Sequence, residues 1–282
     1  MSLSIHNNGA VLVSGIINLS PDSFYNESRC DTITAVLKKA EQMVEDGADI
    51  LDIGAESSRP GSQPTASEVD LDRLLPVVAS LRKSIGVPLS VDTYKPEVAE
   101  KVLDEGVEWI NDITGLQKYE AMAPLIAGYG AGVVMMHMRG TPATMQNNLY
   151  YDDLLGEVIQ YLKKSLTIAE SAGIAPDRMI VDPGIGFGKS VEQNLELIRH
   201  LDRFKVLNKP ILLGLSRKGF IGNVLNLPVE ERLEGSISAA VIGMMNGARV
   251  LRVHDVKETV RAVKMAQAII YPIKERDDKT FR

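Results

Sequence analysis

The chain has 282 residues, of which 45% are hydrophobic, and a formal net charge of −6. This length allows one large domain or two ordinary ones, and the acidic balance without a basic stripe favours small molecules over nucleic acid as partners. Cys30 is the single cysteine, which excludes a disulfide framework and a thiolate zinc site and suits a reducing compartment. No apolar run reaches membrane-spanning length and the N-terminus lacks the basic region of a signal peptide, so we expect a cytoplasmic protein with no membrane partner.

Apolar segments of two kinds alternate along the chain. Short runs with the length and branching of buried strands lie at 11–17, 50–53, 88–91, 109–110, 132–136, 179–181, 211–213 and 250–253. Apolar residues at helical spacing predict helices between these runs, at 32–46, 69–81, 96–105, 121–129, 154–172, 191–201, 221–245 and 256–270.

Strands that alternate with amphipathic helices indicate a parallel sheet built from right-handed crossovers. About eight such units are present, and eight close a (β/α)₈ TIM barrel. We expect one barrel domain over residues 1–282, with a frayed polar tail at 274–282. A doubly wound open sheet is the alternative, but it needs a chain reversal that nothing in the sequence marks.

The residues just after the predicted strands are polar in every unit. In a barrel these positions share one mouth, where active sites lie. They read Asn18, Ser58 with Arg59, Asp92, Asn111, His137, Asp182, Lys218, and Arg252 with His254.

These residues suggest two kinds of binding. Carboxylates, an amide and an ammonium can read a flat heterocycle, and that set comprises Asp92, Asn111, Asp182 and Lys218. A cationic cluster suits a phosphate or pyrophosphate, and it comprises Arg59, Arg252 and His254, with Asn18 as an oxygen ligand that magnesium tolerates. For His137, which has no obvious partner in sequence, a structural role is favoured.

Two phosphate-binding patterns fail in the glycine-rich stretch 184–190. The Walker pattern needs glycine at the position of Pro183, and the third glycine of the dinucleotide pattern would fall on Lys189. We interpret the stretch as a turn that lets Asp182 point inward, with a plain strand-to-helix turn as an equal alternative. The sequence has no His-Glu-x-x-His motif and no Gly-x-Ser-x-Gly elbow, so zinc hydrolysis and nucleophilic catalysis are not indicated.

The chain resembles dihydropteroate synthase over nearly its full length, because several motifs occur in the order found in that family. They lie at 18–24, 52–61, 90–93, 111–112, 136–138, 182–188, 216–218 and 252–255. The resemblance implies a TIM-barrel transferase of folate biosynthesis. Such an enzyme condenses p-aminobenzoate with 6-hydroxymethyl-7,8-dihydropterin pyrophosphate and gives 7,8-dihydropteroate and pyrophosphate, with magnesium.

The resemblance also implies a homodimer, sensitivity to sulfonamides and a role for each matching residue. The pterin would be held by Asp92, Asn111, Asp182, Lys218 and Arg252. The pyrophosphate would be held by Asn18, Arg59, Arg252 and His254, with Asn18 as the metal ligand. The p-aminobenzoate would lie against Ser58, Phe187, Ser216 and Lys218. The expected catalytic residues are Asp92, Lys218 and Arg252.

The sequence departs from the family pattern at a few positions. The first loop reads Tyr-Asn-Glu-Ser at 25–28 instead of a glycine-bearing Ser-Asp-Gly-Gly, Ser20 and Ser58 replace threonines, and Ala55 replaces a glycine. Two other functions remain open on a pterin-binding barrel. One is methyl transfer to a corrinoid protein, which would not need Arg59, Lys218 or His254, and the other is non-catalytic pterin binding.

Overall fold

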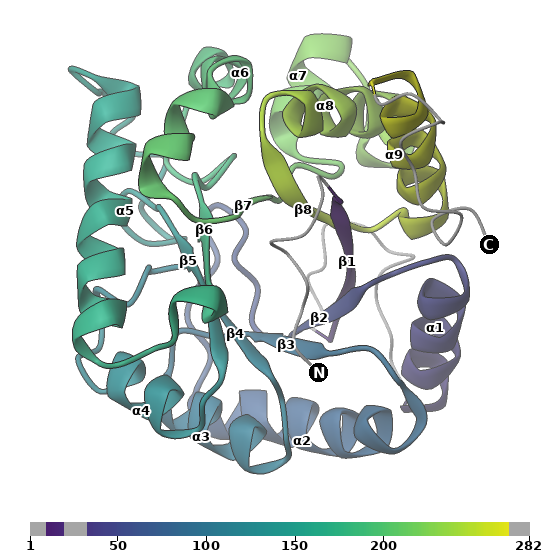
Figure 1. The fold of residues 1–282 in the computed structure, drawn as a ribbon, viewed down its shortest axis with the longest axis vertical. Helices are drawn as coiled ribbons and strands as arrows, with labels where there is room; N and C mark the ends of the chain where they lie inside the picture. Colours follow the sequence, from purple (N-terminus) through teal and green to yellow (C-terminus); the bar gives the residue numbers. More distant parts are fainter. Residues whose placement is uncertain (1–9, 20–32, 271–282) are drawn as a thin grey trace.

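Eight parallel strands form a closed barrel in the computed structural model, which describes residues 10–19 and 33–270 (Figure 1). Each strand pairs with its sequence neighbours, and the last pairs with the first, with Ser14 opposite Arg252. The strands are β1 (Leu12–Asn18), β2 (Ile50–Gly54), β3 (Leu89–Asp92), β4 (Trp109–Asp112), β5 (Gly132–Met136), β6 (Met179–Asp182), β7 (Ile211–Leu213) and β8 (Ala248–Val253). The predicted (β/α)₈ barrel is therefore confirmed, and the open-sheet alternative is wrong.

Helices surround the strands as an outer ring (Figure 1). They are α1 (Ile33–Glu45), α2 (Ser67–Ser84), α3 (Pro96–Asp104), α4 (Met122–Gly128), α5 (Leu154–Ser171), α6 (Val191–Arg199), α7 (Gly219–Leu225), α8 (Leu233–Met245) and α9 (Val256–Ile270). Short 3₁₀ helices at 176–178, 201–207 and 229–231 were not predicted. None of the helices within the described residues is both long and apolar enough to cross a membrane.

Local sequence signals explain where several helices begin and end. Pro96 opens α3, where its missing N–H costs nothing, and Ser190 forms a capping box with Gln193 at the start of α6. The predicted helical region 221–245 is divided because Asn226 adopts a left-handed conformation, with φ of 55°, and ends α7.

Successive side chains along each strand point to opposite faces of the sheet and so pack in two separate cores. Side chains on the outer face, such as Leu51 and Val91, pack against the helices in the main hydrophobic core. Side chains on the inner face fill the N-terminal end of the barrel with an apolar layer of Ile50, Trp109, Val134, Ile180, Leu212 and Val250. Gly132 makes room for the indole, because a Cβ there would lie 2.4 Å from Trp109 Cε3. The polar inner residues therefore gather at the opposite, C-terminal mouth.

Some sequence-based expectations concern parts of the chain outside the described residues. These are the first loop with Ser20 and 25–28, Cys30, and the expected frayed tail at 274–282.

Candidate active site

A pocket opens at the C-terminal mouth of the barrel and contains most of the predicted site residues. Its lining includes Asn18, Ser58, Asp92, Phe187, Ser216, Lys218, Arg252 and His254, together with Ile16, Glu56, Ser57, Gly214 and Arg217. Asn111 and Asp182 are buried at the ends of β4 and β6, and Asn111 pairs in register with Asp92. Arg59 lies half-buried in the loop after β2 and is not part of this lining.

Arg252 on β8 joins two carboxylates across the barrel. Its Nε lies 2.5 Å from Asp52 Oδ2, and its Nη2 lies 3.0 Å from Asp92 Oδ2. Asn111 Nδ2 also donates to Asp52 Oδ2, at 3.4 Å. Asp52, which is 2% exposed, was not predicted as a site residue. The signal for it was a carboxylate at an inward position of an otherwise apolar strand.

The pKa of the Asp92 carboxyl group is raised to near neutral pH. Burial raises its pKa to about 7; Arg252 opposes that rise, while the nearby carboxylates of Asp52, Glu56 and Asp112 add to it. A neutral or cationic hydrogen-bond donor brought beside Asp92 would favour its ionised form. The site is therefore prepared to receive N–H groups or positive charge.

Asp182 is the last residue of β6 and Lys218 directly precedes α7, and the charges of the two side chains interact. Asp182 Oδ1 accepts from the backbone N–H of Gly184 at 2.7 Å, and burial raises its pKa. Lys218 Nζ donates to the carbonyl of Ile185 at 2.5 Å and lies 4.6 Å from the centre of the Phe187 ring. Burial lowers the pKa of Lys218 to about 8, although Asp182 opposes this shift.

The glycine-rich stretch after β6 is a tight turn that packs on the end of β5. Gly184 has a φ of 72°, and a Cβ there would lie 1.9 Å from the carbonyl oxygen of His137. Lys189 Nζ donates to the carbonyls of Gly184 and Phe187, at 2.8 and 2.9 Å, and lies 2.9 Å from His137 Nδ1. Burial, followed by the charge of Lys189, lowers the pKa of His137 to about 2, so the ring is neutral. This geometry supports the structural role expected for His137; its partner Lys189 was missed.

His254 follows β8 and contacts Ser216, which was also predicted as a site residue. Its Nδ1 lies 3.1 Å from Ser216 Oγ, and its backbone N–H donates to the same oxygen at 3.3 Å. Burial, followed by the charge of Arg252, lowers the pKa of His254 to about 3. An anion at this position would offset the repulsion and favour the imidazolium.

The residues at the mouth fit magnesium bound chiefly through a substrate. A Cβ at Gly54 would lie 3.7 Å from Asn18 Oδ1 and 3.6 Å from Asp92 Cβ, so these two side chains face one another across Gly54. Within the described residues no three His, Cys, Asp or Glu side chains form a cluster that could hold a metal. One amide oxygen with phosphate oxygens and water is a coordination that magnesium accepts.

A second cavity, of about 450 Å³, continues outward from the first. The two share Ser58, Phe187 and Lys218, and the second extends between the loops to Met145, Leu149 and α7. Its volume lies within the usual range for small-molecule sites. The mouth therefore offers a buried polar part and an outer, more apolar part.

Comparisons with known proteins agree with this arrangement. Residues 14–254 match the family described as pterin binding enzyme. The dihydropteroate synthase of Clostridium beijerinckii is 42% identical over an alignment that covers 92% of this chain and 94% of that protein. The dihydropteroate synthase of Escherichia coli K12 is 42% identical over 92% of this chain and 91% of its own length.

Solved structures give the same result. Yersinia pestis dihydropteroate synthase with a sulfonamide drug superposes with a TM-score of 0.88 and 40% identity, covering 93% of this chain and 94% of that one. The Thermus thermophilus enzyme in complex with 4-aminobenzoate superposes with a TM-score of 0.82 and 42% identity, covering 92% of this chain and 95% of that one. Since sequence and structure agree over nearly the whole length, this chain belongs to the pterin-binding enzymes and, within them, to the dihydropteroate synthases.

Proposed function

We propose that this protein condenses p-aminobenzoate with 6-hydroxymethyl-7,8-dihydropterin pyrophosphate, forming 7,8-dihydropteroate and pyrophosphate in folate biosynthesis. The observation that carries this proposal is that one mouth holds acceptors for a heterocycle, the half-buried Asp92 and the buried Asp182, and groups for its anionic substituent, the Arg252 guanidinium and the His254 imidazole. Methyl transfer to a corrinoid protein would not need Arg59, Lys218 or His254, and the intact cluster of anion-binding residues counts against non-catalytic pterin binding.

In this proposal the pterin occupies the inner part of the site. Asp182, Asn111 and Lys218 hold its polar edge, and the Arg252 guanidinium lies along its face, where a planar cation stacks well. Asp92 then faces the reacting side of the ring. This arrangement is supported by the burial of Asn111 and Asp182 beneath the open part of the pocket.

The reaction is a displacement at the pterin methylene. The amine nitrogen of p-aminobenzoate forms a bond to this carbon, the carbon–oxygen bond to pyrophosphate breaks, and the amine loses a proton. Arg59, Arg252 and His254 bind the departing pyrophosphate, and Asn18 would hold magnesium, whose charge would stabilise that anion. Ser58, Phe187 and Lys218 border the p-aminobenzoate in the outer part of the site, as their place between the two cavities supports, and Ser216 approaches it from the first cavity.

We also propose that residues 1–282 form a single domain, and that the protein is a cytoplasmic homodimer. The dimer is supported by exposed apolar side chains on two contacting helices, Val224 and Leu225 on α7, and Ile242 and Met245 on α8. Side chains of this kind gather at subunit interfaces.

The activity is tested by release of pyrophosphate. Purified protein is expected to release it only when the pterin pyrophosphate, p-aminobenzoate and magnesium are all present, because the nucleophile, the leaving group and its counter-ion are all needed. Coupled detection of pyrophosphate, with each component omitted in turn, provides the measurement. Release that ignores p-aminobenzoate would indicate hydrolysis, and no release would favour a binding protein; either result rejects the proposal.

Arg59→Lys tests whether the loop after β2 reaches the pyrophosphate. The substitution keeps the charge but loses the planar fork, so kcat/KM should fall by about tenfold or more. Arg82→Lys is the matched control, because Arg82 forms an ion pair with Glu108 at the surface, away from the mouth. If Arg59→Lys has the kinetics of the control, Arg59 lies outside the site.

A further inference from the structure

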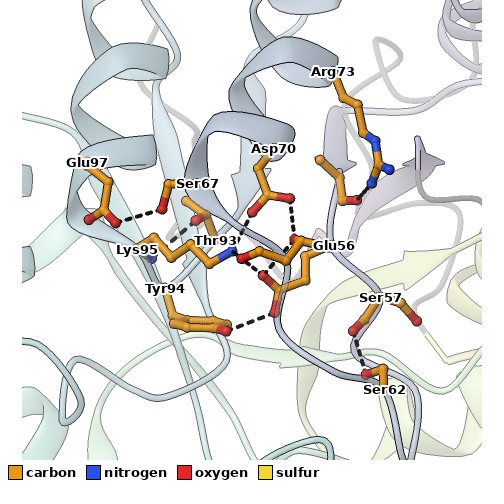
Figure 2. Close-up of polar contacts among 12 residues, drawn as sticks. Glu56, Ser57, Ser62, Ser67, Asp70, Arg73, Thr93, Tyr94, Lys95 and Glu97 are labelled. Atoms are coloured by element: carbon orange, nitrogen blue, oxygen red, sulfur yellow. Dashed lines mark hydrogen bonds and ion pairs between the residues drawn. The ribbon is translucent and has the colours of Figure 1, made fainter.

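Lys95 is a buried cation outside the set of residues that would contact the substrates. It precedes α3, three positions after Asp92, and it is 6% exposed. Its Nζ donates to Asp70 Oδ2 at 2.6 Å and to the carbonyl of Thr65 at 2.7 Å, and it forms an ion pair with Glu56 Oε2. All three N–H groups of the ammonium therefore have acceptors. Figure 2 shows Lys95 pointing between Asp70 and Glu56.

Lys95 binds both ends of the loop that carries Ser58 and Arg59. Glu56 stands directly before this loop, residues 57–64, and Thr65 stands directly after it. The Thr65 hydroxyl donates to Asp70 Oδ1 at 2.6 Å and lies 3.2 Å from Glu56 Oε2. We call Glu56, Thr65, Asp70 and Lys95 the loop clamp. It joins the base of the loop to α2 and to the start of α3.

The loop itself is compact, so its base determines where its side chains lie. The Ser62 hydroxyl lies 2.6 Å from the Ser57 carbonyl and 2.8 Å from the Arg59 carbonyl. The backbone N–H of Gly61 donates to the carbonyl of Pro142 at 2.8 Å. A shift at the base would thus move the whole loop relative to the strand that ends at Asp92.

We propose that Lys95 is a positioning residue of this enzyme, which sets Ser58 and Arg59 against the substrates by holding the base of loop 57–64 beside Asp92. The inference rests on the proposed function for the substrates that the loop meets. It adds a requirement beyond the residues that contact the substrates, namely the carboxylates of Glu56 and Asp70 and the buried ammonium of Lys95.

The charges of the loop clamp determine which variants can test it. Removing Lys95 alone would leave the buried carboxylate of Asp70 and the half-buried carboxylate of Glu56 without a cation, which would destabilise the fold for that reason alone. Lys95→Met combined with Asp70→Leu removes one charge of each sign, and Glu56 keeps the Tyr94 hydroxyl, which donates to its Oε1 at 2.8 Å. Ser67→Ala is the matched control, because Ser67 donates to Glu97 at 2.6 Å and so joins α2 to α3 without touching the loop (Figure 2).

Calorimetry with two probes separates positioning from a general effect on structure. In Lys95→Met/Asp70→Leu the affinity for inorganic pyrophosphate with magnesium should fall by about tenfold or more, as misplaced contacts do. The affinity for 6-hydroxymethylpterin should stay unchanged, since Asp92, Asn111 and Asp182 lie off the loop. Ser67→Ala should match the wild type with both probes. An equal loss of both affinities, or no loss of pyrophosphate affinity, would overturn the proposal.

Hydrogen exchange gives a reading that does not depend on the reaction. Amides of residues 57–64 should exchange faster in the double variant than in Ser67→Ala, while amides of β3 should not change. Equal exchange in the two variants would overturn the role of the loop clamp. Failure of the proposed function would show instead as wild-type protein that does not condense its substrates, so the two failures are distinguishable.

Discussion

Asp92→Asn is expected to lower kcat by up to about three decades while weakening pterin binding much less. As the methylene parts from pyrophosphate, positive charge develops on the pterin beside this carboxylate. At about 4 Å and an effective dielectric near 20, a carboxylate stabilises a full unit cation by roughly 4 kcal/mol, and a partial charge by less. Steady-state kinetics would contradict this role if the variant raised KM and left kcat intact, because Asp92 would then be a binding residue.

The pH dependence provides an independent check on Asp92. Its pKa of about 7 in the free enzyme means that the ionised form is lost as pH falls through 7, so wild-type kcat/KM should decline on that side. The same elevation has an opposite effect on stability. Because the folded state binds the proton more tightly than the unfolded state, the wild type should lose stability relative to Asp92→Asn as pH rises from about 4 to about 7. Parallel stability profiles in urea would contradict the elevated pKa.

Arg252→Met is expected to cost about 3 to 5 kcal/mol of unfolding free energy at pH 8, along with activity. Arg252 contacts both Asp52 and Asp92, and its removal leaves two carboxylates close together at the barrel mouth without a cation. The loss should be smaller at pH 6, because there Asp92 can take up a proton instead. Denaturation in urea at the two pH values measures the difference.

A second substitution separates the two effects of Arg252. Adding Asp52→Asn should restore part of the lost stability, since one of the two uncompensated charges is removed. It should not restore activity, because the guanidinium that faces the pterin and pyrophosphate is still missing. A double variant no more stable than Arg252→Met would show that repulsion between these carboxylates is not the cause.

The barrel could be predicted because its signals are local. Apolar runs such as 50–53 and amphipathic helices such as 256–270 repeat with clear periodicity, and parallel strands place their C-terminal ends at one mouth. The positions of Asn18, Asp92 and His254 in the pocket follow from that rule.

Other features depend on contacts between distant parts of the chain. His137 and Lys189 are 52 positions apart, and Arg252 and Asp52 are 200 apart, so neither pair is visible as a motif. Lys95 could not be distinguished from a solvated lysine, because its burial comes from packing between α2 and α3. Sequence patterns thus predict which positions face the mouth, but not which side chains bind one another there.

The apolar layer at the N-terminal end of the barrel, with Trp109 in it, has a kinetic consequence. Within the described residues it fills the barrel interior below the polar mouth, so we expect ligands to enter and leave through the mouth. In the proposed function the pterin lies deeper than p-aminobenzoate, and an early p-aminobenzoate would obstruct the route to the inner site. We therefore expect ordered binding, in which the pterin pyrophosphate binds before p-aminobenzoate and dihydropteroate leaves before the next turnover starts.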